Sequence, residues 1–171
     1  MPTPSWDLAI TVFFLIGIAF GYILQRDKIV ATLLSVYVGL IITQAVSGNV
    51  QNFFQGDSTV SNMWIRSNAN PFTIRAVIFI AVIMLVSAKS GISAGKSKGL
   101  LSPLEVIIYS IFTSGLILSS LFYFMPEASR EAFVMGSRMA KLVINNYIWW
   151  IILPIGFMIV SGFFHKGSSS D

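Results

Sequence analysis

The residues that could carry out chemistry are few and lie far apart in this chain. It contains no cysteine and a single histidine, His165, at the end of an apolar run. Transition-metal sites and the Cys–His or Ser–His pairs of covalent catalysis need these residue types together with others. The sequence therefore predicts no catalytic site, no metal site and no cofactor, and we expect a protein that is not an enzyme.

The segment SGISAGKSK, residues 90–98, is the nearest approach to a nucleotide-binding motif. A phosphate-binding loop has four residues between its first glycine and the Gly-Lys-Ser/Thr element. Here only three residues separate Gly91 from Gly95, and no buried strand precedes them. We therefore expect a basic connection that binds no nucleotide. The other basic residues flank apolar runs, which predicts contact with lipid headgroups and no nucleic-acid partner.

The acidic residues suggest charge pairing more than proton chemistry. Asp7 and Arg75 fall near the same ends of two apolar runs and form a candidate ion pair, although each could instead reach the headgroups separately. Glu127 and Glu131 lie close to Arg130, which indicates ordinary charge balance on a helix surface. No carboxylate falls in the middle of an apolar run, as a proton relay would require.

Five long apolar runs must position these residues. Of the 171 residues, 55% are hydrophobic and 11% are charged. At about 1.5 Å of rise per residue, a helix over each run reaches the roughly 30 Å thickness of a bilayer core. We predict an all-α polytopic membrane protein, residues 1–171 forming a single bundle with five transmembrane helices over about residues 8–24, 29–47, 71–88, 104–125 and 147–164.

The segments between the runs carry helix signals of their own. Residues 127–142 alternate polar and apolar positions with helical spacing, which predicts one interfacial amphipathic helix. Asn70 before Pro71, and the capping box of Ser102 and Glu105, predict where two apolar helices begin. Pro154 predicts a bend in the last helix, and the small polar tail 167–171 is expected to be disordered.

Small residues on the first two runs predict helix packing. Gly17 and Gly21 form a G-x-x-x-G pair, and a second four-residue repeat follows on the next run. Lipid gives no hydrophobic drive between helices, so close approach depends on small side chains. These residues favour packing of the two helices within one chain, or else an interface with a second copy or a partner: Gly17, Gly21, Ala31, Ser35, Gly39 and Thr43.

Ser110, Thr113 and Ser114 give the fourth run a polar face. Such residues could line a path for ions or solutes. More often they bond to their own helix or join it to a neighbour. The channel interpretation therefore stays open at this stage as the alternative.

The distribution of Lys and Arg predicts an orientation. Bases in short connections fall on one side, which by the positive-inside rule is the cytoplasm. They are Arg26, Lys28, Lys89, Lys96, Lys98 and Lys166. The N-terminus is then outside and the C-terminus cytoplasmic. Four tryptophans would form a belt at the outer interface: Trp6, Trp64, Trp149 and Trp150.

The layout of the first four runs resembles a known family. Trp6-Asp7 opens the first run, Gly21 closes it before the short turn 25–28, and Ile29–Ser35 begin the second. A polar aromatic loop, a third helix, a basic glycine-rich loop and a fourth helix follow, over roughly residues 5–125. This pattern is similar to the colicin V production protein family of small bacterial inner-membrane proteins. The resemblance implies a bacterial plasma membrane protein tied to envelope function or export, with no catalytic residues to carry over.

Two hypotheses for function follow. The first is a non-enzymatic membrane subunit or scaffold that works through helix contacts, as a homo-oligomer or within a larger membrane complex. The second is a small oligomeric channel or transporter component, with the polar face of the fourth run lining its path.

Overall fold

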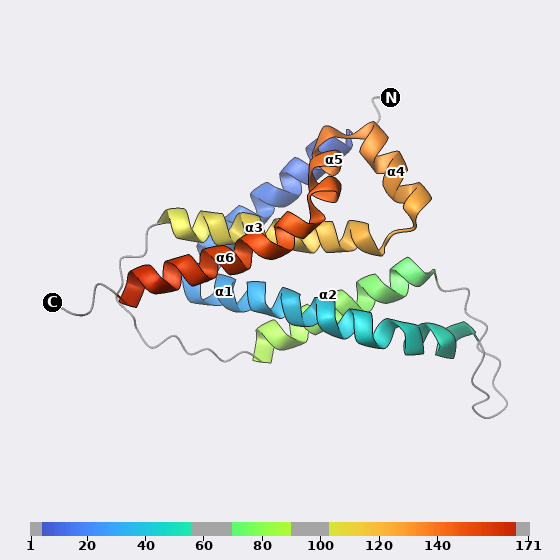
Figure 1. Cartoon of the computed structure of the whole chain (residues 1–171), viewed down its shortest axis with the longest axis horizontal. Coiled ribbons are helices and arrows are strands. Elements are labelled where there is room, and N and C mark those ends of the chain that lie inside the picture. The colour runs from blue at the N-terminus through green and yellow to red at the C-terminus, as the bar shows by residue number, and fades with distance from the viewer. Residues whose placement is uncertain (1–4, 56–69, 90–102, 167–171) are drawn as a thin grey trace.

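The computed structural model describes residues 5–55, 70–89 and 103–166, and every element within them is an α-helix. The order along the chain is shown in Figure 1: α1 (Trp6–Gln55), α2 (Pro71–Lys89), α3 (Pro103–Phe124), α4 (Glu127–Gly136), α5 (Arg138–Asn145) and α6 (Tyr147–Lys166). The predicted all-α class is confirmed for this part of the chain. The loop 90–98 and the tail 167–171 lie outside the described residues.

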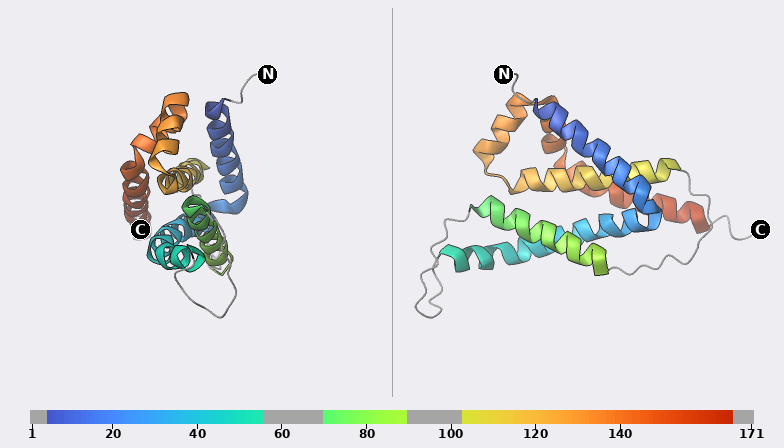
Figure 2. Two further views of the ribbon diagram at one scale, coloured as in Figure 1. Left: turned by 90° about the vertical axis from the view of Figure 1, so that its right-hand side faces the viewer. Right: turned by 180° about the vertical axis from the view of Figure 1, so that it is seen from behind.

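Helix α1 contains both of the first two predicted spans. Its backbone stays helical from Trp6 to Gln55, whereas the sequence predicts two helices separated by a turn at residues 25–28. The axis nevertheless turns sharply between the two halves, which run in opposite senses along the long axis of the molecule (Figures 1 and 2). Two stretches of α1 are each long and apolar enough to cross a membrane: Trp6–Leu24 and Lys28–Asn52.

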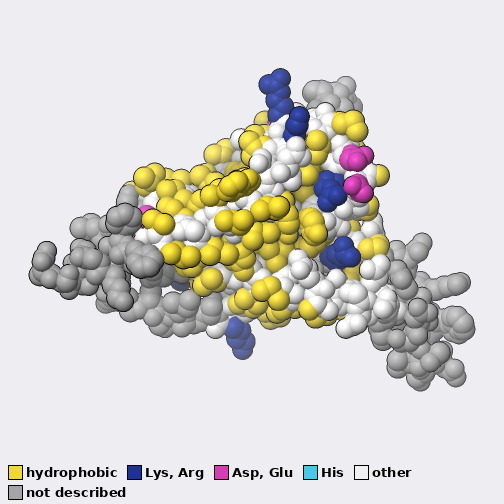
Figure 3. Space-filling view, viewed as in Figure 1, with side chains coloured by type: hydrophobic (Ala, Val, Ile, Leu, Met, Phe, Trp, Pro, Cys, Tyr) yellow, Lys and Arg dark blue, Asp and Glu magenta, His cyan; other side chains and the backbone are white. Residues whose placement is uncertain are grey.

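Two further helices, α2 and α3, also have the length and composition of membrane spans, so the described residues contain four. A fifth is obtained if α5 and α6 are taken as one bent span, with an angle of 66° between Arg138–Asn145 and Tyr147–Ser161. Hydrophobic side chains cover the middle of the face in Figure 3, while charged ones lie toward its margins. These features are compatible with a helical membrane protein.

The helices pack around a shared core. Helix α1 contacts both α2 and α3, and α6 lies along α3 (Figure 2). Side chains from α1, α2 and α3 meet in this core without measurable exposure or nearly so: Leu33, Val36, Phe79, Tyr109 and Leu116. Two hydrogen bonds attach α6, one from the Tyr37 hydroxyl to the Ile151 carbonyl (2.6 Å) and one between the Tyr109 and Ser161 hydroxyls (2.6 Å).

The predicted start of α2 is confirmed. The helix begins at Pro71, and the Phe72 N–H donates to the side-chain oxygen of Asn70 at 3.1 Å. Proline fits this position because the first backbone N–H groups of a helix have no partner within it.

The single helix predicted for residues 127–142 is wrong. Helix α4 ends at Gly136 and α5 begins at Arg138, with Ser137 between them in an extended conformation (φ −148°, ψ 128°). Helix α6 continues through the buried Pro154, and a separate bend of 66° lies between α5 and Tyr147–Ser161. A glycine followed by a serine ends one helix and starts another more readily than it continues a single one.

Candidate functional site

The G-x-x-x-G pair of α1 packs closely against α3. A Cβ atom added to Gly17 would collide with the Ser114 side chain, whose own Cβ would lie only 3.0 Å away. One added to Gly21 would collide in the same way with Ser110, whose Cβ would lie 2.9 Å away. Gly17 and Gly21 therefore pack on α3, four residues apart on each helix, and not chiefly on the second half of α1 as the sequence suggested.

The second small-residue repeat is buried on α1. All four of its residues are buried: Ala31, Ser35, Gly39 and Thr43. Gly39 meets α2, because a Cβ added there would lie 3.2 Å from atoms of both Phe79 and Ile83. The Ser35 hydroxyl donates to the Ala31 carbonyl at 2.8 Å. Small side chains thus bring α1 close to α2 as well as to α3.

The serines and the threonine predicted to line a polar path are instead part of the helix packing. Ser110 donates to the Val106 carbonyl at 2.6 Å, and Thr113 donates to the Tyr109 carbonyl at 2.7 Å. Together with Ser114 they are buried, and Ser110 and Ser114 face the glycines of α1. The Ser110 and Thr113 hydroxyls therefore bond within α3, and Ser114 lies against Gly17 of α1.

Asp7 and Arg75 do not form the candidate ion pair within the described residues. The Asp7 carboxylate instead accepts a hydrogen bond from the Ser137 hydroxyl (2.5 Å) and one from the Met139 N–H (2.9 Å). Ser137 in turn accepts from the Ala140 N–H (2.9 Å). Asp7 and Ser137 together satisfy N–H groups at the start of α5, where the helix dipole favours an anion.

This junction was missed from the sequence because Asp7 and Ser137 are 130 residues apart. The pair Gly136-Ser137 does carry a signal, since serine is a preferred N-cap residue. Nothing local, however, identifies Asp7 as its partner. The junction fixes the beginning of α1 against the beginning of α5 at one end of the molecule.

Aromatic side chains surround the same end. Trp6 packs edge-on against Phe133, with ring centroids 4.6 Å apart. Trp150 packs on Gly115 of α3 and beside Phe14 of α1. Trp149 is 57% exposed, as a belt residue would be, and Trp64 lies outside the described residues. Gly115 makes room for the Trp150 ring, and no local pattern in the chain indicates this contact.

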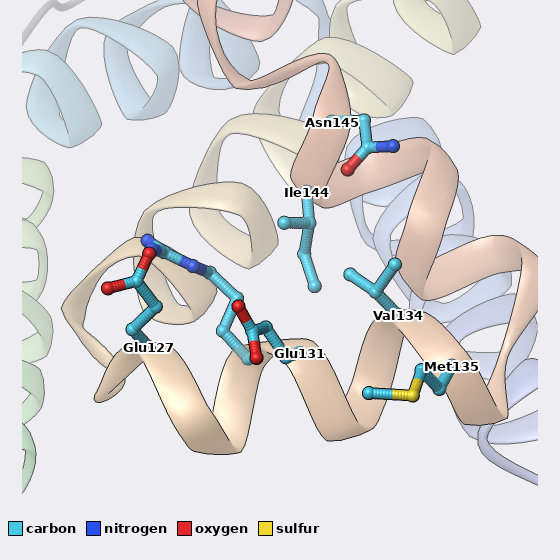
Figure 4. A pocket seen from close by; sticks show the side chains of 7 residues that line it. Glu127, Glu131, Val134, Met135, Ile144 and Asn145 are labelled. Atoms are coloured by element: carbon cyan, nitrogen blue, oxygen red, sulfur yellow. The ribbon is translucent and has the colours of Figure 1, made fainter.

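A pocket of about 340 Å³ opens between α4 and the bend that joins α5 to α6. Figure 4 shows side chains from both walls: Glu127, Arg130, Glu131, Val134 and Met135 from α4, and Ile144 and Asn145 from α5. Arg130 Nη2 lies 3.9 Å from Glu127 Oε1. The pocket therefore combines an apolar wall with carboxylates, a guanidinium and an amide.

The remaining predicted positions add no chemistry. Glu105 lies in the first turn of α3 as the capping box requires, but its partner Ser102 is outside the described residues, as is the side chain of His165. In the described helices, no three His, Cys, Asp or Glu side chains gather as metal ligands would.

No family model, no curated protein and no solved structure matches the chain. The geometry of the helices and of the pocket is therefore what supports any statement about function.

Proposed function

We propose that the protein is an integral membrane subunit or scaffold without catalytic activity, which acts through helix contacts with itself or a partner complex. The observation that carries this proposal is the use of its polar and small residues. At Gly17–Ser114 they pack one helix against another, and at Asp7–Ser137 they satisfy a helix end.

The exposed face of α6 is available for contacts with another helix. Ile152, Ile159 and Val160 are all more than half exposed, and a Cβ added to Gly156 among them would meet nothing within 4 Å. An open glycine lets another helix approach closely, as small residues do at helix interfaces in lipid. A second copy of the chain or a partner subunit fits this face.

We further propose a bacterial plasma membrane location with the N-terminus outside and the C-terminus in the cytoplasm, in a role connected with envelope function or export. The density of Lys and Arg supports this orientation. Cysteines introduced at Ser61 and Ser93 test it: only the first should react with an impermeant reagent added from outside. Labelling of both from one side would contradict the orientation.

Purification from the native membrane in mild detergent tests the subunit role. We expect a stoichiometric partner or a defined oligomer, and we expect Gly156→Leu to weaken that association while the monomer keeps its fold. Liposomes that contain the purified protein should stay tight to ions and small solutes. A flux that depends on the protein would contradict the scaffold and support the channel alternative.

A further inference from the structure

We propose that the pocket between α4 and the α5–α6 bend binds the headgroup of a phosphatidylethanolamine-type lipid, with the phosphate on Arg130 and the primary ammonium on Glu127 and Glu131. This inference rests on the membrane placement proposed above, but it does not depend on the scaffold role.

The size and lining of the pocket fit an amphipathic ligand. A volume of about 340 Å³ lies in the range of small-molecule sites. Val134, Met135 and Ile144 form an apolar wall, and the carboxylate of Glu131 lies across from Ile144 in Figure 4. A headgroup with its glycerol backbone presents both kinds of surface to such a site.

The charges in the pocket match a zwitterion. The 3.9 Å from Arg130 Nη2 to Glu127 Oε1 exceeds the 2.7–2.9 Å typical of a charge-assisted hydrogen bond, so Glu127 does not saturate the guanidinium. Arg130 is also largely covered, at 27% side-chain exposure against 80% for Glu127. A partly covered guanidinium suits a phosphate, which can accept two of its N–H groups.

The opposite end of the zwitterion also has partners. Glu127 and Glu131 bring two carboxylates to one guanidinium, which leaves the pocket with an excess of negative charge. Helix α5 ends at Asn145, and a helix C-terminus carries partial negative charge. A primary ammonium donates three hydrogen bonds and can use these acceptors, whereas the trimethylated ammonium of phosphatidylcholine has no N–H to donate.

On the proposed membrane placement, the pocket lies next to the ends of apolar helices, where headgroups would be. Helix α4 begins three residues after the apolar helix α3 ends at Phe124, and α6 begins directly after the bend at Asn146. No residue of α4 is buried, and in Figure 3 the acidic side chains lie beyond the hydrophobic middle of the molecule. A lipid is therefore a more fitting occupant than a soluble amine, because its acyl chains would follow the neighbouring apolar surface.

Native mass spectrometry of the full-length protein in mild detergent tests the proposal. Phosphatidylethanolamine, phosphatidylcholine and phosphatidylglycerol with matched acyl chains are added in turn. We expect one tightly held lipid and a preference of about tenfold for phosphatidylethanolamine over phosphatidylcholine, since an added charge-assisted hydrogen bond has roughly that value.

Three variants assign the roles. Glu131→Gln should lower the preference over phosphatidylcholine without abolishing it, because Glu127 remains as an acceptor, whereas Arg130→Gln should weaken both lipids alike because both carry the phosphate. Lys141→Gln, exposed on α5 and outside the pocket, should change neither. Unchanged helix content and thermal midpoint would show that each variant is folded.

Several outcomes would overturn the proposal. They are equal retention of phosphatidylethanolamine and phosphatidylcholine by the unmodified protein, a preference for phosphatidylglycerol, and a preference that Glu131→Gln leaves unchanged. Displacement of the lipid by an equal concentration of soluble phosphoethanolamine would also overturn it. Recovery of a partner complex in the same preparations reports separately on the scaffold role.

Discussion

Two regions of the molecule use serine in opposite ways. In the α1–α3 contact, Ser110 donates to its own helix and its small size lets Gly21 approach. At the α1–α5 junction, Ser137 donates across elements to Asp7 and accepts from the first turn of α5. The first region is held by shape and the second by hydrogen bonds.

The difference follows from the surroundings of each region. In an apolar layer the gain comes from van der Waals contact, which requires the backbones to be close. At the end of the bundle, the first N–H groups of α5 need acceptors, and a carboxylate and a hydroxyl accept from two of them, those of Met139 and Ala140. Substitutions should therefore act through volume in the first region and through lost acceptors in the second.

The largest effect is expected for Gly17→Leu. The new side chain would occupy the space of Ser114 and force α1 and α3 apart, which should cost about 1–3 kcal/mol of unfolding free energy. Denaturant titration in detergent micelles measures the loss. Gly156→Leu is the matched control, since its Cβ position is open and its monomer stability should be unchanged. Equal losses in both variants would refute a contact limited by shape.

A smaller effect is expected for Ser137→Ala. Removing the N-cap hydroxyl leaves the Ala140 N–H without its acceptor and should cost about 1 kcal/mol. Asp7→Asn should also destabilise the junction, and the double variant should lose less than the sum because both residues serve the same helix end. Ser129→Ala, exposed on α4, is the control. Strict additivity would show that the two side chains act independently.

Tyr109→Phe sharpens the comparison within the apolar layer. The change keeps the ring and removes the hydrogen bond between the Tyr109 and Ser161 hydroxyls. Such bonds between membrane helices contribute about 0.6 kcal/mol on average, so the unfolding midpoint should fall only slightly. Tyr22→Phe, at a position that is 67% exposed, should leave the midpoint where it is. A loss as large as that of Gly17→Leu would mean that hydrogen bonds dominate here too.

The smallest effect is expected for Glu127→Gln. Its side chain is 80% exposed and lies 3.9 Å from Arg130, and long ion pairs with an exposed partner contribute little to stability. Thermal unfolding should show no measurable change. A clear drop in the midpoint would extend the hydrogen-bonded region from the α1–α5 junction into α4.

The sequence predicts where the helices lie better than it predicts which helices pack against each other. Apolar runs of bilayer length and local caps such as Asn70-Pro71 are read within a few residues, so the class and the start of α2 are correct. The glycines at 17 and 21 announce a close contact, but a glycine carries no information about which helix meets it. Ser110 and Ser114 have the same four-residue spacing, and they are the residues of α3 that face the two glycines.

The candidate site was harder to predict. The Asp7–Arg75 pair follows from charge and depth alone, while the actual partners depend on where Ser137 breaks the helix predicted over 127–142. The pocket depends on the angle at Asn146, which no single residue specifies. Local preference sets where elements end, whereas packing sets the angles between them.

The α1–α3 contact also constrains how the chain matures during synthesis. The glycine face of α1 emerges from the ribosome first, and the second half of α1 and all of α2 are made before its serine-bearing counterpart appears. Membrane helices can insert before they associate, so on the membrane placement proposed above the first hairpin would lie in the bilayer with that face open to lipid or to another protein. A chaperone of the nascent chain could bind the glycine face at that stage, before α3 packs on it.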